Sequence, residues 1–437
     1  MTVIGFDDTD SRTQGMCTTY LATRLAAAIV DAGWTVDRTL LVRLNPAVEH
    51  KTRGNAALAL HTDIPATEAV TLAADALDSL AIDDDARTSP GLIVAPGEPD
   101  SVDDAIAVFA RRAMREQLRL VDALSLADEA GYEHRGWAPE GCAVSGRGRI
   151  GALAAIGAWR AFDEWTYEQI AYREFDRCGT PREIDADSVF AAADRSSQAV
   201  WDTVDRGEQQ TVCVPNAPGP ILYGIRGDDP VAVSRVGDDI VSESVAHSTL
   251  FVTNQGTDLH LADGAIGSLT DGRGYRVDGV VTTSPETRQG GHVFFQLGAP
   301  EAELGNSQSA ESVSCVAFEP TKRFRDQVRR LRVDDRLTVC GEYDEGTIKL
   351  EKFAIRHLQR TEQVTPTCPD CDRRMKSAGR NQGYRCRECG TSAPEKTARR
   401  VDRELDIGWY EVPPCARRHI AKPLVRGGFD APTHPER

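Results

Sequence analysis

Apolar residues in the first part of the chain alternate between short runs and stretches with helical spacing. Runs at 3–6, 39–44, 56–61 and 91–95 predict strands, and helical spacing predicts helices over 19–32, 66–80 and 103–128. Gly33 supplies a C-terminal cap for the first of these helices. Together these elements predict an α/β domain over residues 1–135.

The pattern changes in the second part, which we assign to residues 136–265. An Ala-rich apolar helix at 151–159 comes first. Further elements follow as strand 167–173, helix 188–204, strands 211–214 and 221–225, helix 230–236 and strand 249–253. The order βαββαβ is that of a ferredoxin-like domain.

The third part, residues 270–360, reads as a barrel. Strands are expected at 276–282, 292–297, 313–318, 336–343 and 347–355, with a short basic helix at 323–331 between the third and fourth strands. This layout predicts an OB fold, which commonly binds single-stranded or looped nucleic acid. Such barrels also serve as spacers, so binding is only modestly favoured on the barrel alone.

Two Cys-x-x-Cys pairs mark the last part, residues 365–437, and predict a zinc ribbon with structural Zn²⁺. The expected ligands are Cys368, Cys371, Cys386 and Cys389, because two thiolate pairs at this separation can close a tetrahedral site. Six cations surround these ligands against three carboxylates, which makes the module locally basic. The alternatives are four unrelated surface cysteines and a solvated basic face. We favour a nucleic-acid contact.

Composition changes this picture in two ways. A length of 437 residues exceeds what one core organises, so several domains are expected, and no apolar run is long enough to cross a bilayer. The net charge is -16 and only seven lysines occur, a balance that suits solubility in high salt and therefore does not exclude a nucleic-acid partner. We expect a cytoplasmic protein of a halophile that has no contact with membranes.

The run Asp7-Asp8-Thr9-Asp10 is the clearest candidate for chemistry. It follows a buried strand directly, where sheets of α/β proteins bind ligands. Carboxylates there can hold Mg²⁺, which neutralises and orients the phosphates of a nucleotide. Thr18 comes near the start of the next helix, where a hydroxyl could contact or accept a phosphoryl group. Spacing alone favours an ordinary helix cap for Thr18.

A second cluster of polar residues lies in the same domain, at the connection between two strands. Cations and amides there suit a phosphate clamp, with a solvated turn as an equal alternative; the residues are Arg43, Asn45, Lys51, Arg53 and Asn55. A weaker signal is the glycine-rich run 146–151 at a helix start, which resembles an anion-binding turn but lacks the dinucleotide fingerprint.

Several of these stretches together resemble the archaeal tRNA-isoleucine 2-agmatinylcytidine synthetase family, over almost the whole chain. The matching runs are Gly5-Phe-Asp-Asp-Thr-Asp-Ser11, Gly15-Met-Cys-Thr-Thr-Tyr20, Arg43-Leu-Asn-Pro46, Lys51-Thr-Arg-Gly-Asn55, Gly148-Arg-Ile-Gly-Ala-Leu-Ala-Ala-Ile-Gly157, Tyr167-Glu168 with Ile170-Ala-Tyr-Arg173, Tyr223-Gly-Ile-Arg-Gly227 and Asn254-Gln-Gly-Thr-Asp258. The resemblance implies a multidomain α/β and α+β protein with a kinase-like ATP-binding catalytic domain, a ferredoxin-like domain, an OB barrel and a zinc ribbon.

The resemblance also implies an activity: an ATP-dependent ligase that attaches agmatine to carbon 2 of the wobble cytidine in the isoleucine tRNA with a CAU anticodon. Asp7, Asp8 and Asp10 would be the magnesium and phosphate residues, and Thr18 the threonine that becomes phosphorylated. For agmatine, carboxylates and aromatic rings are candidates; we name Tyr167, Glu168, Trp201, Asp202 and Asp258. The alternatives are a non-catalytic RNA-binding scaffold and a tRNA-modifying enzyme that uses another amine or base.

Overall fold

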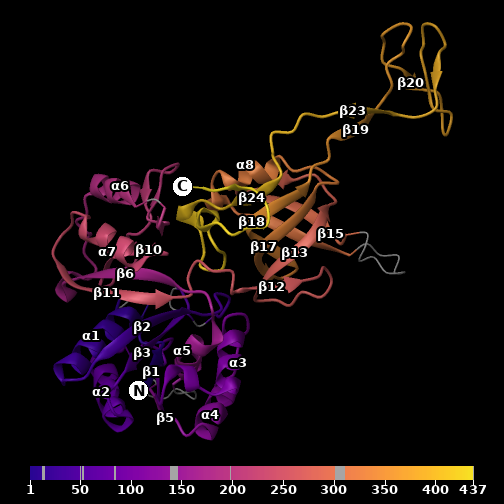
Figure 1. Cartoon of the computed structure of the whole chain (residues 1–437). Helices are drawn as coiled ribbons and strands as arrows, with labels where there is room; N and C mark the ends of the chain where they lie inside the picture. The colour runs from indigo at the N-terminus through magenta and orange to yellow at the C-terminus, as the bar shows by residue number, and fades with distance from the viewer. Residues whose placement is uncertain are drawn as a thin grey trace.

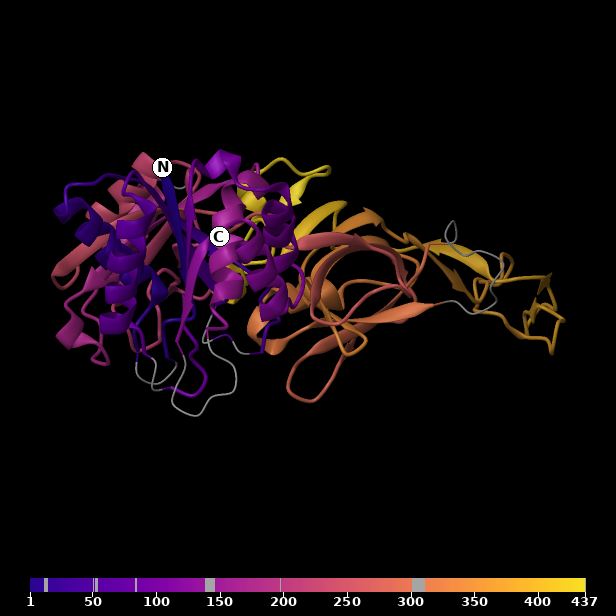
Figure 2. The same ribbon diagram turned by 90° about the horizontal axis from the view of Figure 1, so that it is seen from below.

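The computed structural model of the chain describes residues 1–11, 15–49, 51, 54–82, 85–137, 146–196, 198–300 and 311–436. Figures 1 and 2 show an elongated molecule, with a large α/β body at one end, a barrel in the middle and a small ribbon module at the far end. The C-terminus does not end on the ribbon. It returns to the region between the barrel and the α/β body (Figure 1).

One nine-stranded sheet runs through both of the first two predicted domains. Its order is β5-β4-β1-β3-β2-β11-β6-β10-β7. Its two halves meet where β2 and β11 pair in parallel, with Leu40 opposite Val252. Every other neighbouring pair is antiparallel. The strands are β1 (Thr2–Asp7), β2 (Val36–Arg43), β3 (Ala56–Thr62), β4 (Gly91–Pro96), β5 (Glu133–Gly136), β6 (Thr166–Arg173), β7 (Val200–Trp201), β10 (Ile221–Gly227) and β11 (Val245–Thr253).

Helices cover both faces of the N-terminal half of this sheet. In β1, Ile4 and Phe6 face one core and Val3 faces the other, as the period of two in a strand requires. The first core packs against α1 (Thr18–Asp31) and α2 (Ala66–Leu80), and the second against α3 (Asp104–Ala113), α4 (Leu120–Glu129) and α5 (Arg149–Ala161). α5 therefore packs on the N-terminal half, against β1, β3 and β4.

Two long helices expected from spacing are shorter in the structure. The helix predicted over 103–128 is split into α3 and α4, because the intervening residues make tertiary contacts instead. Arg115 there donates from Nε to the carbonyl of Leu259 across 2.8 Å. The helix predicted over 188–204 ends at Arg195, because Val200 and Trp201 form β7 and pair with β10. Tertiary pairing overrides helical spacing in both places.

The second half of the sheet carries two helices and a small hairpin. α6 (Ala186–Arg195) and α7 (Pro230–Asp238) pack with β6 and β10 around a core of their own. The strand predicted over 211–214 is mostly a turn, since only β9 (Gln210–Thr211) pairs there, with β8 (Val204–Asp205).

The third part is a closed five-stranded barrel, as predicted. Pairings β13–β15, β15–β16, β16–β18, β18–β17 and β17–β13 complete the ring. A helix, α8 (Phe324–Arg329), lies between the third and fourth of these strands and packs its apolar side into the barrel core. The strands are β13 (Arg273–Val281), β15 (Val293–Gly298), β16 (Ser312–Ala317), β17 (Arg336–Asp344) and β18 (Thr347–His357), with β12 (Leu261–Gly264) and β14 (Glu286–Thr287) at the margin.

The ribbon module projects from the barrel on a two-stranded stalk (Figure 1). β19 (Thr361–Val364) and β23 (Thr397–Arg400) form the stalk, and three two-residue strands form the module; they are β20 (Lys376–Ser377), β21 (Tyr384–Arg385) and β22 (Ser392–Ala393). The chain then returns through residues 408–436, called here the C-terminal strap, whose β24 (Gly408–Glu411) pairs with β18 and with β25 (Thr433–His434).

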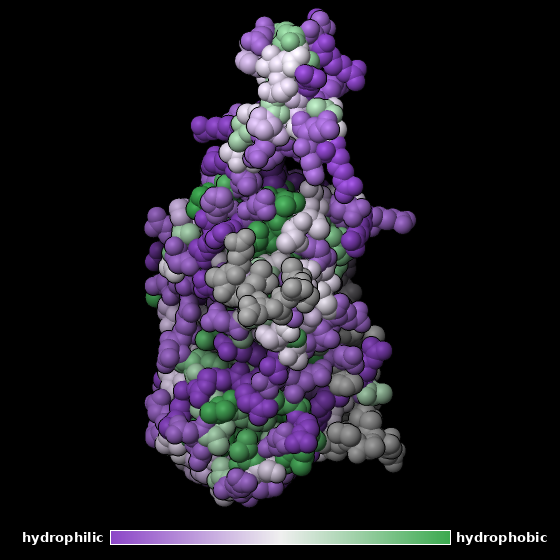
Figure 3. Space-filling model, turned by 90° about the vertical axis from the view of Figure 1, so that its right-hand side faces the viewer, coloured by the Kyte–Doolittle hydropathy of each residue, from purple (hydrophilic) through white to green (hydrophobic). Residues whose placement is uncertain are grey.

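The surface agrees with the charged composition. In the face that Figure 3 shows, hydrophilic residues cover most of the molecule, and hydrophobic residues gather in small groups. Among the residues that the structure describes, no helix is both long and apolar enough to cross a membrane.

Candidate functional site

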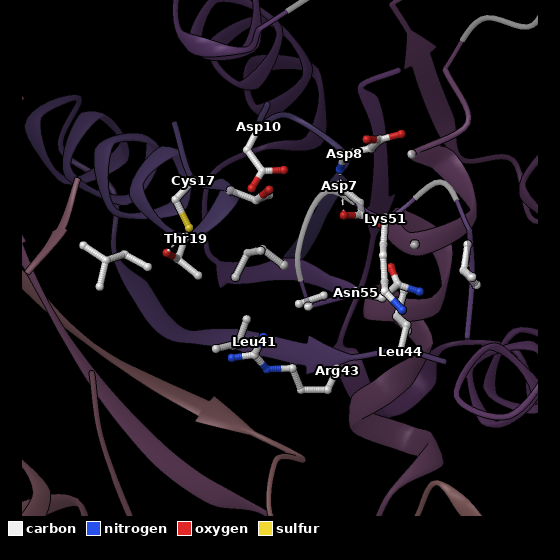
Figure 4. A pocket seen from close by; sticks show the side chains of 18 of the residues that line it. Asp7, Asp8, Asp10, Cys17, Thr19, Leu41, Arg43, Leu44, Lys51 and Asn55 are labelled. Atoms are coloured by element: carbon white, nitrogen blue, oxygen red, sulfur yellow. Dashed lines mark hydrogen bonds between the residues drawn. The ribbon is translucent and has the colours of Figure 1, made fainter. Parts of the chain in front are cut away.

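A cavity of about 650 Å³ lies where the two halves of the large sheet meet. Its walls come from the end of β1, the start of α1, the end of β2, the start of α5, and strands β6 and β10 (Figure 4). The cavity collects most of the predicted site residues: Asp7, Asp8, Asp10, Thr18, Arg43, Lys51 and Asn55. Arg53 falls outside the described residues.

Asp7 lies at the floor of the acidic side of the cavity. Burial, then the neighbouring charges of Asp8 and Asp10, raises the pKa of its carboxyl well above the usual range. The N-terminal turn of α5 packs directly on it, and a Cβ on Gly151 would come within 2.0 Å of Asp7 Oδ2. Only glycine allows this approach, which brings the positive end of the helix dipole to the carboxylate.

Asp8 is held by an arginine that the sequence did not single out. Arg147 donates from Nη2 to Asp8 Oδ2 across 2.6 Å and to the carbonyl of Arg87 across 2.8 Å. Burial raises the pKa of Asp8 to about 6, although Arg147 opposes the shift. The backbone of Asp8 has φ +59°, so the chain turns sharply after β1. The glycine-rich run 146–151 thus delivers a cation to the cavity.

Thr18 is the first residue of α1 and is not its cap. The N-cap is Cys17, whose side chain makes no capping hydrogen bond. Thr18 is buried in the cavity wall and accepts a hydrogen bond from Thr9 across 3.1 Å. Its hydroxyl is therefore next to the acidic run, at the positive end of a helix, where phosphate groups bind favourably.

The opposite wall is basic and contains one buried ion-pair cluster. Glu168 from β6 lies between two arginines, 3.4 Å from Arg43 Nη2 and 3.1 Å from Arg226 Nε. Its side chain is only 4% exposed, so both charges of the pairing are shielded from water. Tyr167-Glu168 and Tyr223-Gly-Ile-Arg-Gly227 belong to the runs matched by family resemblance, and this contact brings the two runs together in one site.

Two predicted residues of the basic cluster, Asn45 and Asn55, hold the loop between β2 and β3 through hydrogen bonds. Asn45 is buried, donates to the carbonyl of Gly272 across 2.9 Å and accepts from the amide of Ala47 across 3.0 Å. It does not line the cavity. Asn55 lines the cavity and donates to the carbonyl of Asn45 across 2.9 Å, which holds the two ends of the loop together.

Of the five residues named for agmatine, Glu168 is the one found in the described lining of this cavity. Its carboxylate is already shared by two arginines. Asp202 pairs with Arg417 across 2.8 Å, and Asp258 pairs with Lys352 across 2.7 Å. These two carboxylates hold the C-terminal strap and the barrel against the α/β body.

The four cysteines of the ribbon converge as the spacing predicted. One ligand atom from each lies within 4.8 Å of the others, and in the described parts of the chain this is the one such group. Backbone bonds from Asp372 to Cys368 and from Gly390 to Cys386, at 2.9 and 3.1 Å, form the two turns that present the pairs. Four sulfurs so arranged suit a tetrahedral Zn²⁺ ion.

The cavity has carboxylates on one side and arginines on the other, and it belongs to a multidomain protein whose α/β body is joined to a barrel and a four-cysteine ribbon. Family models match three parts of the chain: the TiaS TCKD domain at residues 3–64, the TiaS FLD domain at 146–260 and the TiaS C-terminal zinc ribbon domain at 365–405. The chain belongs to the TiaS family, since relatives match it over its full length.

Two relatives illustrate that likeness. The isoleucine-tRNA 2-agmatinylcytidine synthetase TiaS of Haloquadratum walsbyi is 58% identical over 468 residues, covering 100% of both chains. That of Methanosarcina mazei is 40% identical, covering 97% of both. The family assignment made from sequence motifs is confirmed.

Solved structures agree. A complex of TiaS with its isoleucine tRNA and ATP superposes with a TM-score of 0.84 at 38% identity. A complex of TiaS with the same tRNA, AMPCPP and agmatine superposes with a TM-score of 0.84 at 36% identity. Each comparison covers 100% of this chain and 99% of the other.

Proposed function

We propose that this chain is an ATP-dependent ligase that joins agmatine to carbon 2 of the wobble cytidine in the isoleucine tRNA with a CAU anticodon. The observation that carries the proposal is the full-length match to TiaS complexes that hold an isoleucine tRNA with ATP, or with AMPCPP and agmatine. The cavity between the two halves of the sheet supports it, because it is large enough for reacting groups and gathers the motif residues.

The chemistry requires an activated oxygen. The oxygen on carbon 2 of cytosine is a poor leaving group until it carries a phosphoryl group from ATP. The primary amine of agmatine then forms the new carbon–nitrogen bond, the carbon–oxygen bond breaks, and phosphate leaves with that oxygen. Positioning and charge stabilisation are the main tasks that such a transfer leaves to the protein.

The acidic side of the cavity suits magnesium. Asp7, Asp8 and Asp10 supply carboxylate oxygens, and burial raises the pKa of Asp7 and of Asp8, so a cation bound there would offset the cost of burying their charges. The oxygens of these three carboxylates do not gather as closely as the four cysteine sulfurs, which lie within 4.8 Å of one another. Magnesium commonly takes only one or two carboxylates beside phosphate oxygens and water. When bound there, it would neutralise the phosphates of ATP.

Roles for the other cavity residues follow from their positions. Thr18 is proposed as the hydroxyl that accepts a phosphoryl group, because it lies beside the acidic run at the start of α1. Arg43, Lys51 and Asn55, which line the same cavity, are proposed to bind the phosphates. Arg53 and Asn45 keep that role only as sequence predictions.

We extend the proposal to the architecture. The sheet order β11-β6-β10-β7 with α6 and α7 on one face supports a ferredoxin-like unit within residues 136–265. The N-terminal body, residues 1–135 with α5, would be the kinase-like unit. Residues 270–360 would form the OB fold, and 365–437 the ribbon and tail. None of the described cysteines forms a disulfide, which supports a cytoplasmic location.

Mass spectrometry of the tRNA tests the function. Purified chain, ATP, magnesium, agmatine and the CAU-anticodon tRNA are incubated, and nucleotides are separated by digestion. We expect a mass gain at the wobble cytidine alone, absent when ATP or agmatine is omitted. A gain at another nucleotide, or with another amine only, would assign a different substrate. A chain that shows no magnesium-dependent ATP turnover, and whose activity does not fall on Asp8→Asn, would instead be a non-catalytic RNA-binding scaffold.

A further inference from the structure

The loop Asn254-Gln-Gly-Thr-Asp258, called here the junction loop, contacts each large part of the molecule. It follows β11, the strand that joins the two halves of the sheet. Asn254, Gln255 and Thr257 are almost completely buried, although all three are polar. Buried polar side chains persist where their hydrogen bonds are made, and the partners of this loop show what it holds.

One partner is Arg43 of the cavity, which the junction loop holds by backbone and side chain. The amide of Arg43 donates to Asn254 Oδ1 across 2.7 Å, and Asn254 Nδ2 donates to the carbonyl of Arg43 across 3.0 Å. Nε of Arg43 donates to Gln255 Oε1 across 2.9 Å. An arginine with its guanidinium fixed in this way enters the reaction already oriented.

The loop itself has little freedom. Gly256 has φ +70°, and a Cβ there would come within 2.5 Å of the Trp201 ring. Thr257 donates to the carbonyl of Asn254 and Thr166 to that of Gln255, each across 2.7 Å. Hydrogen bonds to the carbonyls of Asn254 and Gln255, with the close packing of Gly256 on Trp201, hold the loop in one conformation.

The other end of the loop is fastened to the barrel by a buried lysine. Lys352 of β18 is 1% exposed, and its Nζ lies 2.7 Å from each oxygen of Asp258. Its third hydrogen bond goes to the carbonyl of Lys422 in the strap, across 3.2 Å, and the amide of Lys422 donates to Asp258 across 2.7 Å. The Asp258 side chain is 40% exposed, but Lys352 is buried and each of its donors is satisfied, an arrangement that specifies one geometry between barrel and loop.

We propose that the junction loop couples the barrel to the active cavity: Gln255 is a positioning residue for the Arg43 guanidinium, and the Lys352–Asp258 pair sets the place of the loop. Binding of RNA to the barrel and ribbon thereby affects the orientation of the Arg43 guanidinium through one rigid connection. The inference rests on the proposed phosphate-binding role of Arg43.

A double-mutant cycle tests the coupling, with Gln255→Leu and Lys352→Met made singly and together. Each single change is expected to lower kcat/KM for ATP at least tenfold, with the Kd for tRNA unchanged within twofold. Because both changes act through Arg43, kcat/KM of the double variant should be no lower than that of the less active single variant. Gln255→Glu retains the acceptor oxygen and should recover most of the activity.

Lys349→Met is the matched control. Lys349 also lies on β18 and pairs with Glu342 and Asp344, but these partners belong to the barrel itself. This variant should keep the wild-type kcat/KM. The thermal midpoint of each variant is measured alongside, and Asp258→Asn takes the place of Lys352→Met in the cycle where the latter does not fold.

The outcomes separate the inference from its premise. Full activity of folded Gln255→Leu, or effects that multiply in the double variant, would overturn the coupling. Arg43→Ala is measured in parallel. An inactive Arg43→Ala beside an active Gln255→Leu overturns the inference alone, whereas an active Arg43→Ala overturns the proposed role of Arg43 and the inference with it.

Discussion

Arg147 Nη2 and Asp8 Oδ2 are 2.6 Å apart, although 139 positions separate the two residues in the chain. The contact joins the turn after β1 to the turn before α5 at the mouth of the acidic side of the cavity. It offsets only part of the cost of burying Asp8, because the pKa of that carboxyl remains raised to about 6. The site therefore retains negative charge that folding alone does not stabilise.

That retained charge predicts a pH-dependent stability difference between wild type and Asp8→Asn. In the unfolded chain the carboxyl loses its proton near pH 3.8, and in the folded chain near pH 6. Ionisation therefore costs the folded wild type stability as pH rises from about 4 to 6, and the variant escapes that cost. The free energy of unfolding of the variant, relative to wild type, should rise across this window by up to ~3 kcal/mol.

Denaturant unfolding at pH 4, 5, 6 and 7, in the presence of a chelator, measures this difference. Taking pH 4 as the reference removes any constant loss from the altered contact with Arg147. If the difference in the free energy of unfolding between variant and wild type stays constant or falls as pH rises, burial does not disfavour the ionised form of Asp8.

Thr18 should be required for its hydroxyl and not for its place in the helix. Thr18→Ala is expected to abolish labelling of the protein by gamma-labelled ATP and to reduce agmatine attachment, whereas Thr18→Ser keeps both. The stability cost should stay within ~1 kcal/mol, since Thr18 is not the cap of α1. Thr71, whose hydroxyl bonds its own helix on the surface, supplies the control Thr71→Ala. Full labelling of folded Thr18→Ala would refute the role.

The close contact between α5 and Asp7 predicts that Gly151→Ala is severe. The added carbon would meet Asp7 Oδ2 at 2.0 Å, so either the carboxylate or the helix must move. We expect a loss of activity of a hundredfold or more, with destabilisation of about 2 kcal/mol from overpacking. Gly237→Ala in α7 is the control, because its new carbon would meet nothing nearer than 3.5 Å. Equal activities of the two variants would contradict this account.

Removal of the ribbon ligands should separate metal binding from catalysis. Cys368→Ser combined with Cys371→Ser is expected to release about one zinc per chain and to weaken tRNA binding roughly tenfold, as basic contacts to phosphate are lost. Plasma emission spectrometry and tRNA titration measure the two effects. Cys178→Ser, at a free thiol outside the ribbon, should change neither. A double variant that still holds zinc would exclude this ligand set.

Local sequence signals predicted the parts of the site that lie within one short segment. Asp7 and Thr18 could be found because each is adjacent to an element boundary, and Cys368 and its partners because ligand spacing is a local property. Arg147 could not, since nothing near it indicates that its partner lies after β1. The pairing of Glu168 with Arg43 and Arg226 likewise depends on three strands that only the folded sheet brings together.

The same limit applies to the fold. Strand and helix periods located most elements, and the closed barrel followed from their order. The break between α3 and α4 could not be predicted from spacing, because it depends on a tertiary contact of Arg115. Nor did spacing show that the large sheet continues through β2 and β11, where only two residue pairs join the halves.

The stalk of the ribbon places its two connections to the barrel side by side, with Thr361 opposite Arg400 and the amide of Val401 2.8 Å from the carbonyl of Arg360. A module inserted at such a point can be removed or exchanged without rerouting the rest of the chain. The strap that follows still reaches β18 through its own strand. Chimaeric chains that carry another ribbon joined at these two positions should therefore fold with the barrel and the cavity unchanged.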